Sequence, residues 1–157
     1  MAPDKATDVR KLRRADSTPA FTPERANRAL VLVRRIVADI VSHYRHFTDL
    51  RRERERLLRT APNGNAAKPA TAIRHERMEE LNDGIDRCTE VLHALNRELL
   101  ATGCVLKDWR SGLVDFPALR HGRRVWLSWR PGEPLVAYWH EWNEGLAGRL
   151  PIDADFN

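Results

Sequence analysis

The sequence predicts an α+β protein, in which a long antiparallel helical hairpin with a coiled-coil-like pattern precedes a small tryptophan-rich antiparallel β-meander. Two observations carry this prediction. Between residues 21 and 102, apolar side chains recur at steps of three and four, which is the period of a helix. After Gly103 the pattern changes to short apolar and aromatic runs separated by glycine and proline, and all five tryptophans lie in this part.

The first twenty residues carry five basic and three acidic groups and few apolar ones, so residues 1–20 are predicted to be a disordered basic tail. No apolar stretch follows the N-terminal charges, and no run approaches the roughly 18 apolar residues of a membrane span. The length of 157 residues fits one ordinary domain. We therefore expect a cytoplasmic protein that does not enter a membrane.

Residues 21–102 form the predicted hairpin. Thr22 can cap a helix that begins at Pro23, and the apolar positions continue to about Arg59. Residues 61–70 contain two prolines and a glycine and are predicted to form a flexible tip. A second helix is expected from about Thr71 to Thr102, with Gly103 as its C-terminal cap.

The net charge of +5 is concentrated in the first helix. The arginines of residues 51–56 are expected to lie opposite acidic residues of the second helix, and interhelical ion pairs would then set the register of the hairpin. This interpretation competes with nucleic-acid binding through the tail and the first helix. Domains that bind nucleic acid usually present a basic face without an acidic one beside it, which makes nucleic acid the weaker alternative.

Residues 103–157 form the predicted β-module, packed on the base of the hairpin. Strands are expected at residues 104–107, 113–116, 123–130 and 135–142, with a type II turn centred on Pro131 and Gly132. With loops at residues 120–122 and 131–134, one face would carry Asp115, Val125, Leu127, Trp129, Tyr138, His140 and Trp142. A slip of one residue in the first hairpin would move Asp115 to the other face.

Four polar residues and one tryptophan of this module are the candidate site: Asp115, Glu133, His140, Arg149 and Trp129. A histidine oriented by a carboxylate can act as a base, and an arginine can bind a carboxylate or phosphate. Yet no nucleophile motif, glycine-rich phosphate loop or metal-ligand spacing accompanies them. The two cysteines form no Cys-x-x-Cys pair, so we expect neither a metal nor a cofactor.

Several short motifs together resemble the bacterial family catalogued as domain of unknown function 2203. They are the residues of 21–24, 112–117, 132–133, 139–140 and 145–149, together with Trp129. The resemblance covers residues 21–152 and implies a helical hairpin followed by the aromatic module, without implying an activity. Members of the family often have Cys-Trp where this chain has Ser128-Trp129, so a thiol at this place is not part of its chemistry.

The residues favour a non-enzymatic protein-interaction or assembly module, with a protein as partner or self-association through the hairpin. The alternative is a small-ligand or anion-binding protein, or a minor enzyme, with its site at the polar cluster. A covered His140 would favour the first interpretation, and a concave pocket with convergent polar groups would favour the second.

Overall fold

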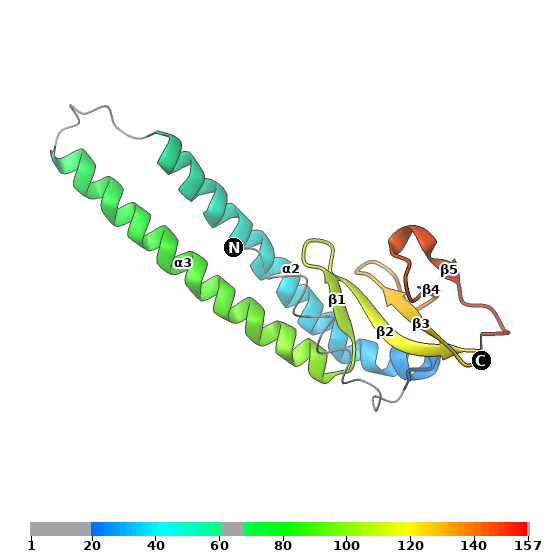
Figure 1. The fold of residues 1–157 in the computed structure, drawn as a ribbon. Helices are drawn as coiled ribbons and strands as arrows, with labels where there is room; N and C mark the ends of the chain where they lie inside the picture. Colours follow the sequence, from blue (N-terminus) through cyan, green and yellow to red (C-terminus); the bar gives the residue numbers. More distant parts are fainter. Residues whose placement is uncertain (1–19, 61–67, 157) are drawn as a thin grey trace.

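The computed structural model describes residues 20–60 and 68–156 and has the predicted α+β architecture (Figure 1). The predicted tail lies outside the described residues except for Ala20, and so do residues 61–67 of the predicted tip. The elements are, in order, helices α2 (Pro23–Arg59) and α3 (Lys68–Ala101), strands β1 (Val105–Asp108), β2 (Leu113–Arg120), β3 (Arg123–Trp129) and β4 (Tyr138–Glu141), the 3-10 helix η2 (Leu146–Gly148) and β5 (Leu150–Pro151).

Both ends of the first helix agree with the prediction. The Thr22 side chain accepts a hydrogen bond from the Arg25 backbone N–H at 3.3 Å, and Pro23 occupies the first helical position.

The second helix begins three residues earlier than predicted, at Lys68. Pro69 is tolerated in its first turn, because a backbone N–H at that position would have no partner within the helix. The predicted tip at 61–70 is therefore too long. Gly103, at φ 94°, follows the end of α3 as expected.

The ion pair between the helices has its two charges on the opposite helices from those predicted. Glu53 of α2 accepts from Arg77 of α3 at 2.6 Å, and Arg54 contacts the amide of Asn82 at 3.4 Å. The cross-helix ion pair found in the described residues thus joins an acid of the first helix to an arginine of the second. Leu50 packs against Gly84, where an added Cβ would lie 3.1 Å from the leucine Cδ1.

The sheet is a five-stranded antiparallel meander in the order β1-β2-β3-β4-β5, but its register differs by one residue from the prediction. Arg120 pairs with Arg123, so the first hairpin turns on two residues, His121 at φ 49° and Gly122 at φ 75°. The second hairpin is shifted in the same way, with Ser128 opposite Tyr138. Because side chains alternate along a strand, these shifts exchange the two faces of β3 relative to β2 and β4. Each β3 side chain therefore lies on the opposite face of the sheet from the one predicted.

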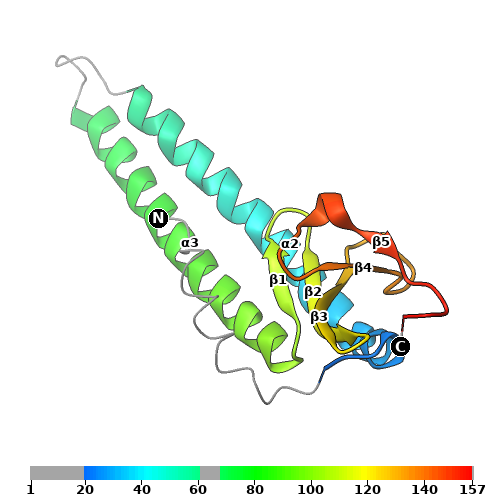
Figure 2. The same ribbon diagram turned by 45° about the vertical axis from the view of Figure 1, so that its right-hand side comes forward.

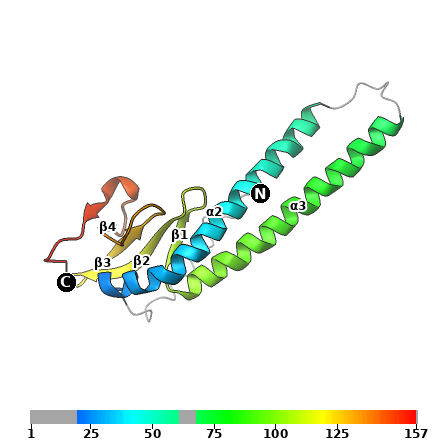
Figure 3. The ribbon, with the colours of Figure 1, turned by 180° about the vertical axis from the view of Figure 1, so that it is seen from behind.

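One face of the sheet packs against α2 and forms the core (Figure 3). Its strand residues are Leu106, Val114, Phe116, Ala118, Val125, Leu127, Trp129 and Trp139, which cluster with apolar residues of α2 and α3. The free edge of β2 is occupied by Phe21, whose backbone N–H donates to the Pro117 carbonyl at 2.7 Å. At the other end of the chain, Phe156 is buried against Trp139, with ring centroids 6.1 Å apart.

Beyond the sheet, α2 and α3 continue side by side toward the tip (Figures 1 and 2). We call residues 46–59 and 68–88 the arm, and the sheet with the remaining parts of both helices the base. None of the helices in the described part of the chain is apolar enough over a sufficient length to cross a membrane.

Candidate functional site

The candidate polar residues lie mostly on the face of the sheet that points away from α2, which we call the outer face. The corrected register places Asp115 beside Ser128 and His140 beside Trp126 on this face. Asp115, Ser128 and His140 are 1%, 0% and 3% exposed and are the buried polar residues of the described chain. Trp129 points to the opposite face, into the core, away from Asp115 and His140.

Asp115 and His140 form a buried ion pair. The imidazole Nε2 lies 3.0 Å from Asp115 Oδ2, and Nδ1 lies 3.0 Å from the Glu141 carbonyl oxygen. The Glu141 carbonyl can only accept, so Nδ1 donates to it; with Asp115 ionised, Nε2 donates as well, and this corresponds to the protonated imidazolium. Burial acts to lower the pKa of His140, but its hydrogen bond to Asp115 and the charge of that carboxylate outweigh burial and raise the pKa above its usual value.

A stack of aromatic and cationic side chains borders this pair. The Lys107 ammonium lies 3.8 Å from Asp115 Oδ2 and 4.3 Å from the centre of the Trp126 ring. The other side of Trp126 stacks on Trp142, with ring centroids 4.1 Å apart and an interplanar angle of 10°. Arg124 lies over Trp142 at 5.7 Å. Trp142 thus covers Trp126, the cross-strand neighbour of His140.

Glu133 and Arg149 form a second, bidentate ion pair. The two terminal guanidinium nitrogens donate to the two carboxylate oxygens at 2.7 and 2.8 Å, and one of them also donates to the Ser128 carbonyl at 3.2 Å. The guanidinium lies 4.4 Å from the Tyr138 ring centroid. Burial acts to raise the pKa of Glu133, but hydrogen bonds from Arg149 and the Arg130 backbone N–H lower it below its usual value.

The second ion pair connects parts of the module that are distant in sequence. Glu133 belongs to the turn between β3 and β4, whereas Arg149 directly precedes β5. The Glu133 backbone carbonyl also accepts from Trp129 Nε1 at 2.9 Å. The Glu133–Arg149 pair therefore holds the C-terminal segment on the outer face. The turn that contains Glu133 also holds the Trp129 indole on the inner face.

Three buried polar atoms near these pairs have no hydrogen-bond partner among the described residues: Asp115 Oδ1, Ser128 Oγ and Arg149 Nε. Ser128 and Lys107 were not among the predicted site residues. Alternation along β1 and β3 would have placed both beside Asp115 if the turn length had been predicted correctly. The predicted cluster therefore exists as two separate pairs with an additional serine and lysine.

The arrangement offers little for acid–base or nucleophilic chemistry. A general base needs a lone pair directed at substrate, whereas both His140 nitrogens lie 3.0 Å from oxygen atoms of the protein itself. Both cysteines are free and buried, and burial raises the pKa of the Cys104 thiol to about 11, which leaves it unreactive. Within residues 20–60 and 68–156, no three His, Cys, Asp or Glu side chains gather as metal ligands would.

The profile of a family described as an uncharacterized conserved protein, DUF2203, matches residues 20–152. The chain therefore belongs to this family, in agreement with the resemblance of its motifs. No curated protein and no solved structure matches the chain.

Proposed function

We propose that this DUF2203 protein is a non-enzymatic cytoplasmic assembly protein whose arm binds a second copy of the chain. The main support is the incomplete burial of the arm. On α2, no residue after Ile40 is fully buried. On the α3 side of the arm, the buried residues are Leu81, Ile85 and Cys88. Two helices alone cannot enclose an apolar seam, which is why such pairs commonly assemble into four-helix bundles.

Several large apolar side chains of the arm remain accessible. Phe47, Leu50, Leu57 and Met78 are only half-buried. Leu58 near the end of α2 is 56% exposed, and Ile73 near the start of α3 is 67% exposed. A second arm laid against this seam would remove these surfaces from water, at a gain of about 25 cal/mol per Å² of apolar area.

Charge complementarity favours a second copy as the partner. Residues 51–59 of α2 contain five arginines and two glutamates, a net charge of +3, whereas residues 76–86 of α3 contain five acids and one arginine, a net charge of −4. Within the chain, the cross-helix ion pair found between these segments is Glu53 with Arg77. In a two-fold symmetric coiled-coil bundle, α2 of one copy would lie beside α3 of the other and pair the remaining charges.

The covered polar pairs support a structural role for the candidate residues and so favour assembly over a ligand site or enzyme at Asp115, Glu133, His140 and Arg149. Free, buried cysteines are consistent with a reducing cytoplasm. The acidic helix beside the basic one disfavours nucleic acid. Binding to random-sequence duplex DNA at physiological salt is then expected to be no tighter than the roughly 10⁻⁴–10⁻⁶ M of non-specific contacts.

Light scattering on a gel-filtration column tests the proposal. The full chain should elute as a dimer, and Arg52→Glu with Arg56→Glu should make it a monomer, because both arginines are exposed. Glu76→Lys with Asp83→Lys should have the same effect. Mixing the two charge-reversed proteins should restore a heterodimer, since the introduced glutamates of one protein then face the introduced lysines of the other. Arg34→Gln, in the base, is the control and should remain dimeric.

A wild-type chain that stays monomeric at every accessible concentration would contradict self-association. So would a dimer that both charge reversals leave intact, because its interface would then lie outside the arm.

A further inference from the structure

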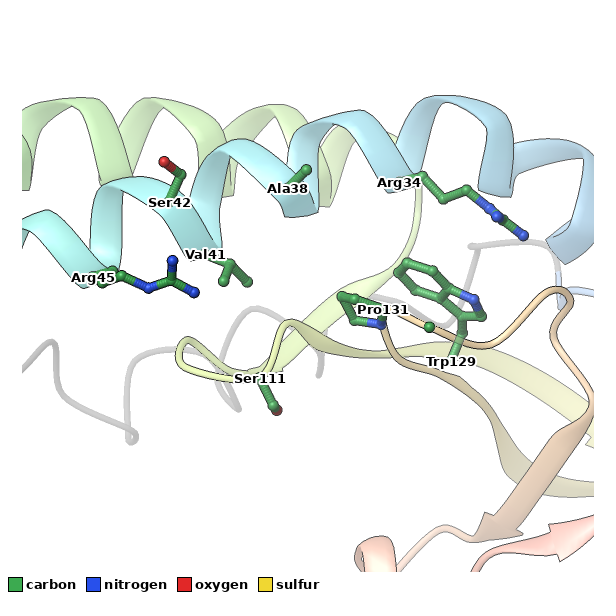
Figure 4. Close-up of a pocket in the computed structure, with 9 residues that line it drawn as sticks. Arg34, Ala38, Val41, Ser42, Arg45, Ser111, Trp129 and Pro131 are labelled. Carbon is green, nitrogen blue, oxygen red and sulfur yellow. The ribbon is translucent and has the colours of Figure 1, made fainter.

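A groove lies between α2 and two turns of the sheet (Figure 4), and no residue of the two ion pairs lines it. One wall is a single stripe of α2, at residues 34, 38, 41, 42 and 45, which are spaced by three and four. The other wall comes from the turn between β1 and β2, which supplies Ser111, and the turn between β3 and β4, which supplies Pro131 and Gly132. Its volume of about 460 Å³ is within the range of small-molecule sites.

The groove is held open by packed elements. Gly112, beside Ser111, lies so close to α2 that an added Cβ would be 2.6 Å from Val37 Cγ1. Trp129 forms part of the lining and is 2% exposed, with its Nε1 bonded to the Glu133 carbonyl. Because Glu133 is itself held by Arg149, this wall is already in place without a ligand.

The charges in the groove are of one sign. Arg34 and Arg45 contribute two guanidinium groups, and none of the residues that line the groove is acidic. Arg34 lies over the Trp129 ring at 5.6 Å and donates to the Pro134 carbonyl. Figure 4 shows the Arg45 guanidinium reaching along α2 toward Val41, and no residue in the described part of the chain forms an ion pair with it. Ala38, Val41 and Pro131 give the space between the two arginines an apolar lining.

We propose that this groove binds a small organic anion, a carboxylate or phosphate monoester attached to an apolar body. The anionic group is held by Arg45, whose planar guanidinium can donate two parallel hydrogen bonds to either group. The apolar body lies along Ala38, Val41 and Pro131, and Arg34 closes the far end. This proposal does not rest on dimerisation, because every lining residue belongs to the base.

The experiment is a titration followed by the indole N–H signals of the ¹⁵N-labelled full chain. The probes are phenyl phosphate, benzoate, inorganic phosphate and the neutral benzyl alcohol. We expect saturable binding in the millimolar range or tighter for phenyl phosphate or benzoate, with the Trp129 signal moving and that of Trp126 unchanged. Inorganic phosphate and benzyl alcohol should bind more weakly, because each lacks one half of the recognised chemistry. Which of the two aryl anions binds more tightly identifies the class as phosphate or carboxylate.

Three variants locate the bound probe. Arg45→Gln should weaken binding by about tenfold or more, since it removes charge-assisted hydrogen bonds. Ala38→Leu should abolish binding by filling the groove, while keeping a residue that favours helix on an exposed position. Arg35→Gln removes a charge from an exposed neighbour outside the groove and should leave affinity unchanged.

The proposal is overturned if neither aryl anion binds saturably, or if inorganic phosphate binds as tightly as phenyl phosphate. It is also overturned if Arg45→Gln and Ala38→Leu both retain wild-type affinity. Repeating the titration with the Arg52→Glu, Arg56→Glu protein separates the groove from the arm, because binding should persist in it whatever its oligomeric state.

Discussion

The base and the arm share the same two helices but are held together differently. In the base, α2 has six buried residues from Ala26 to Ile40, enclosed by the sheet on one side and α3 on another. In the arm, α2 has none, and its apolar stripe is only half covered by α3. The spacing of apolar residues is alike in both regions. Burial therefore depends on whether a third element covers the seam, and the free energy of folding should be concentrated in the base.

The largest contrast is expected between a buried and an exposed acid. Asp115→Ala in the base should lower the free energy of unfolding by about 3–5 kcal/mol, because it leaves the His140 charge buried without its partner. Asp49→Ala in the arm removes an exposed ion pair to Arg52 and should change stability by less than about 1 kcal/mol. Urea denaturation measures both. Equal losses would contradict the concentration of stability in the base.

Substitutions of two leucines that are almost equally buried compare the packing of the base with that of the arm. Leu30 is 2% exposed in the base, and Leu81 is 1% exposed in the arm. Leu30→Ala should cost about 3–5 kcal/mol and Leu81→Ala about 2–3 kcal/mol, since the half-buried neighbours in the arm can move into the space. The pair should be measured in the charge-reversed protein, which lacks the proposed partner. If Leu81→Ala lowers the free energy of unfolding of the charge-reversed protein as much as Leu30→Ala does, the isolated arm is packed as rigidly as the base.

Alanine substitutions at Gly112 and Gly122 distinguish the cost of overpacking from the cost of backbone strain within the base. They have nearly the same φ, 74° and 75°, yet an added Cβ would collide with Val37 at the first and meet nothing within 4 Å at the second. Gly122→Ala should cost about 1–2 kcal/mol from strain alone. Gly112→Ala should cost a further 1–3 kcal/mol or so from overpacking. Thermal unfolding of the two variants checks the difference. If they are equally stable, the turn does not press on α2.

The His140–Asp115 pair should make the stability of the base depend on pH. The folded-state pKa of His140 is raised above the ordinary 6.5, so its contribution is fully present below that value and is lost as pH rises through the folded-state pKa. The difference in unfolding free energy between wild type and His140→Gln should therefore shrink from pH 6 to pH 9. A difference that grows with pH would mean that the folded protein holds the neutral imidazole.

The smallest effect is expected at Gly84, in the middle of α3. Replacing glycine by alanine inside a helix gains up to about 1 kcal/mol, and the contact of the new Cβ with Leu50 at 3.1 Å opposes this gain. Because Leu50 is half-buried and can shift, Gly84→Ala should stabilise the chain slightly. A higher midpoint of thermal unfolding is the expected result. A loss of stability would show that the arm is packed as firmly as the base at this point.

Local patterns predicted the fold well where the determinants are local. The cap at Thr22, the helical period and the glycine after α3 each act within a few residues, and the predicted ends of α2 were correct. The sheet register was wrong because it depends on a single residue of turn length, and His121 gave no sign that it would adopt a positive φ. The short β5 has no alternation of its own and forms by pairing with β4.

The candidate residues do contact one another, but their arrangement differs from the predicted one. Asp115 does meet His140, and Glu133 does meet Arg149, as opposite charges on a small module tend to do. The separation of Trp129 from Asp115 and His140 follows from the register, which the sequence left open. The groove beside Arg45 could not be predicted, because its walls meet only after two turns of the sheet pack against α2.

The stacked indoles of Trp126 and Trp142 provide a built-in optical signal. Two aromatic chromophores this close and nearly parallel couple their electronic transitions, which produces a paired band in circular dichroism. All five tryptophans belong to the base, and none lies in the arm. The coupled band therefore reports the integrity of the sheet alone, whereas the helical band sums base and arm, so one unlabelled sample can reveal whether the two regions melt together or in sequence.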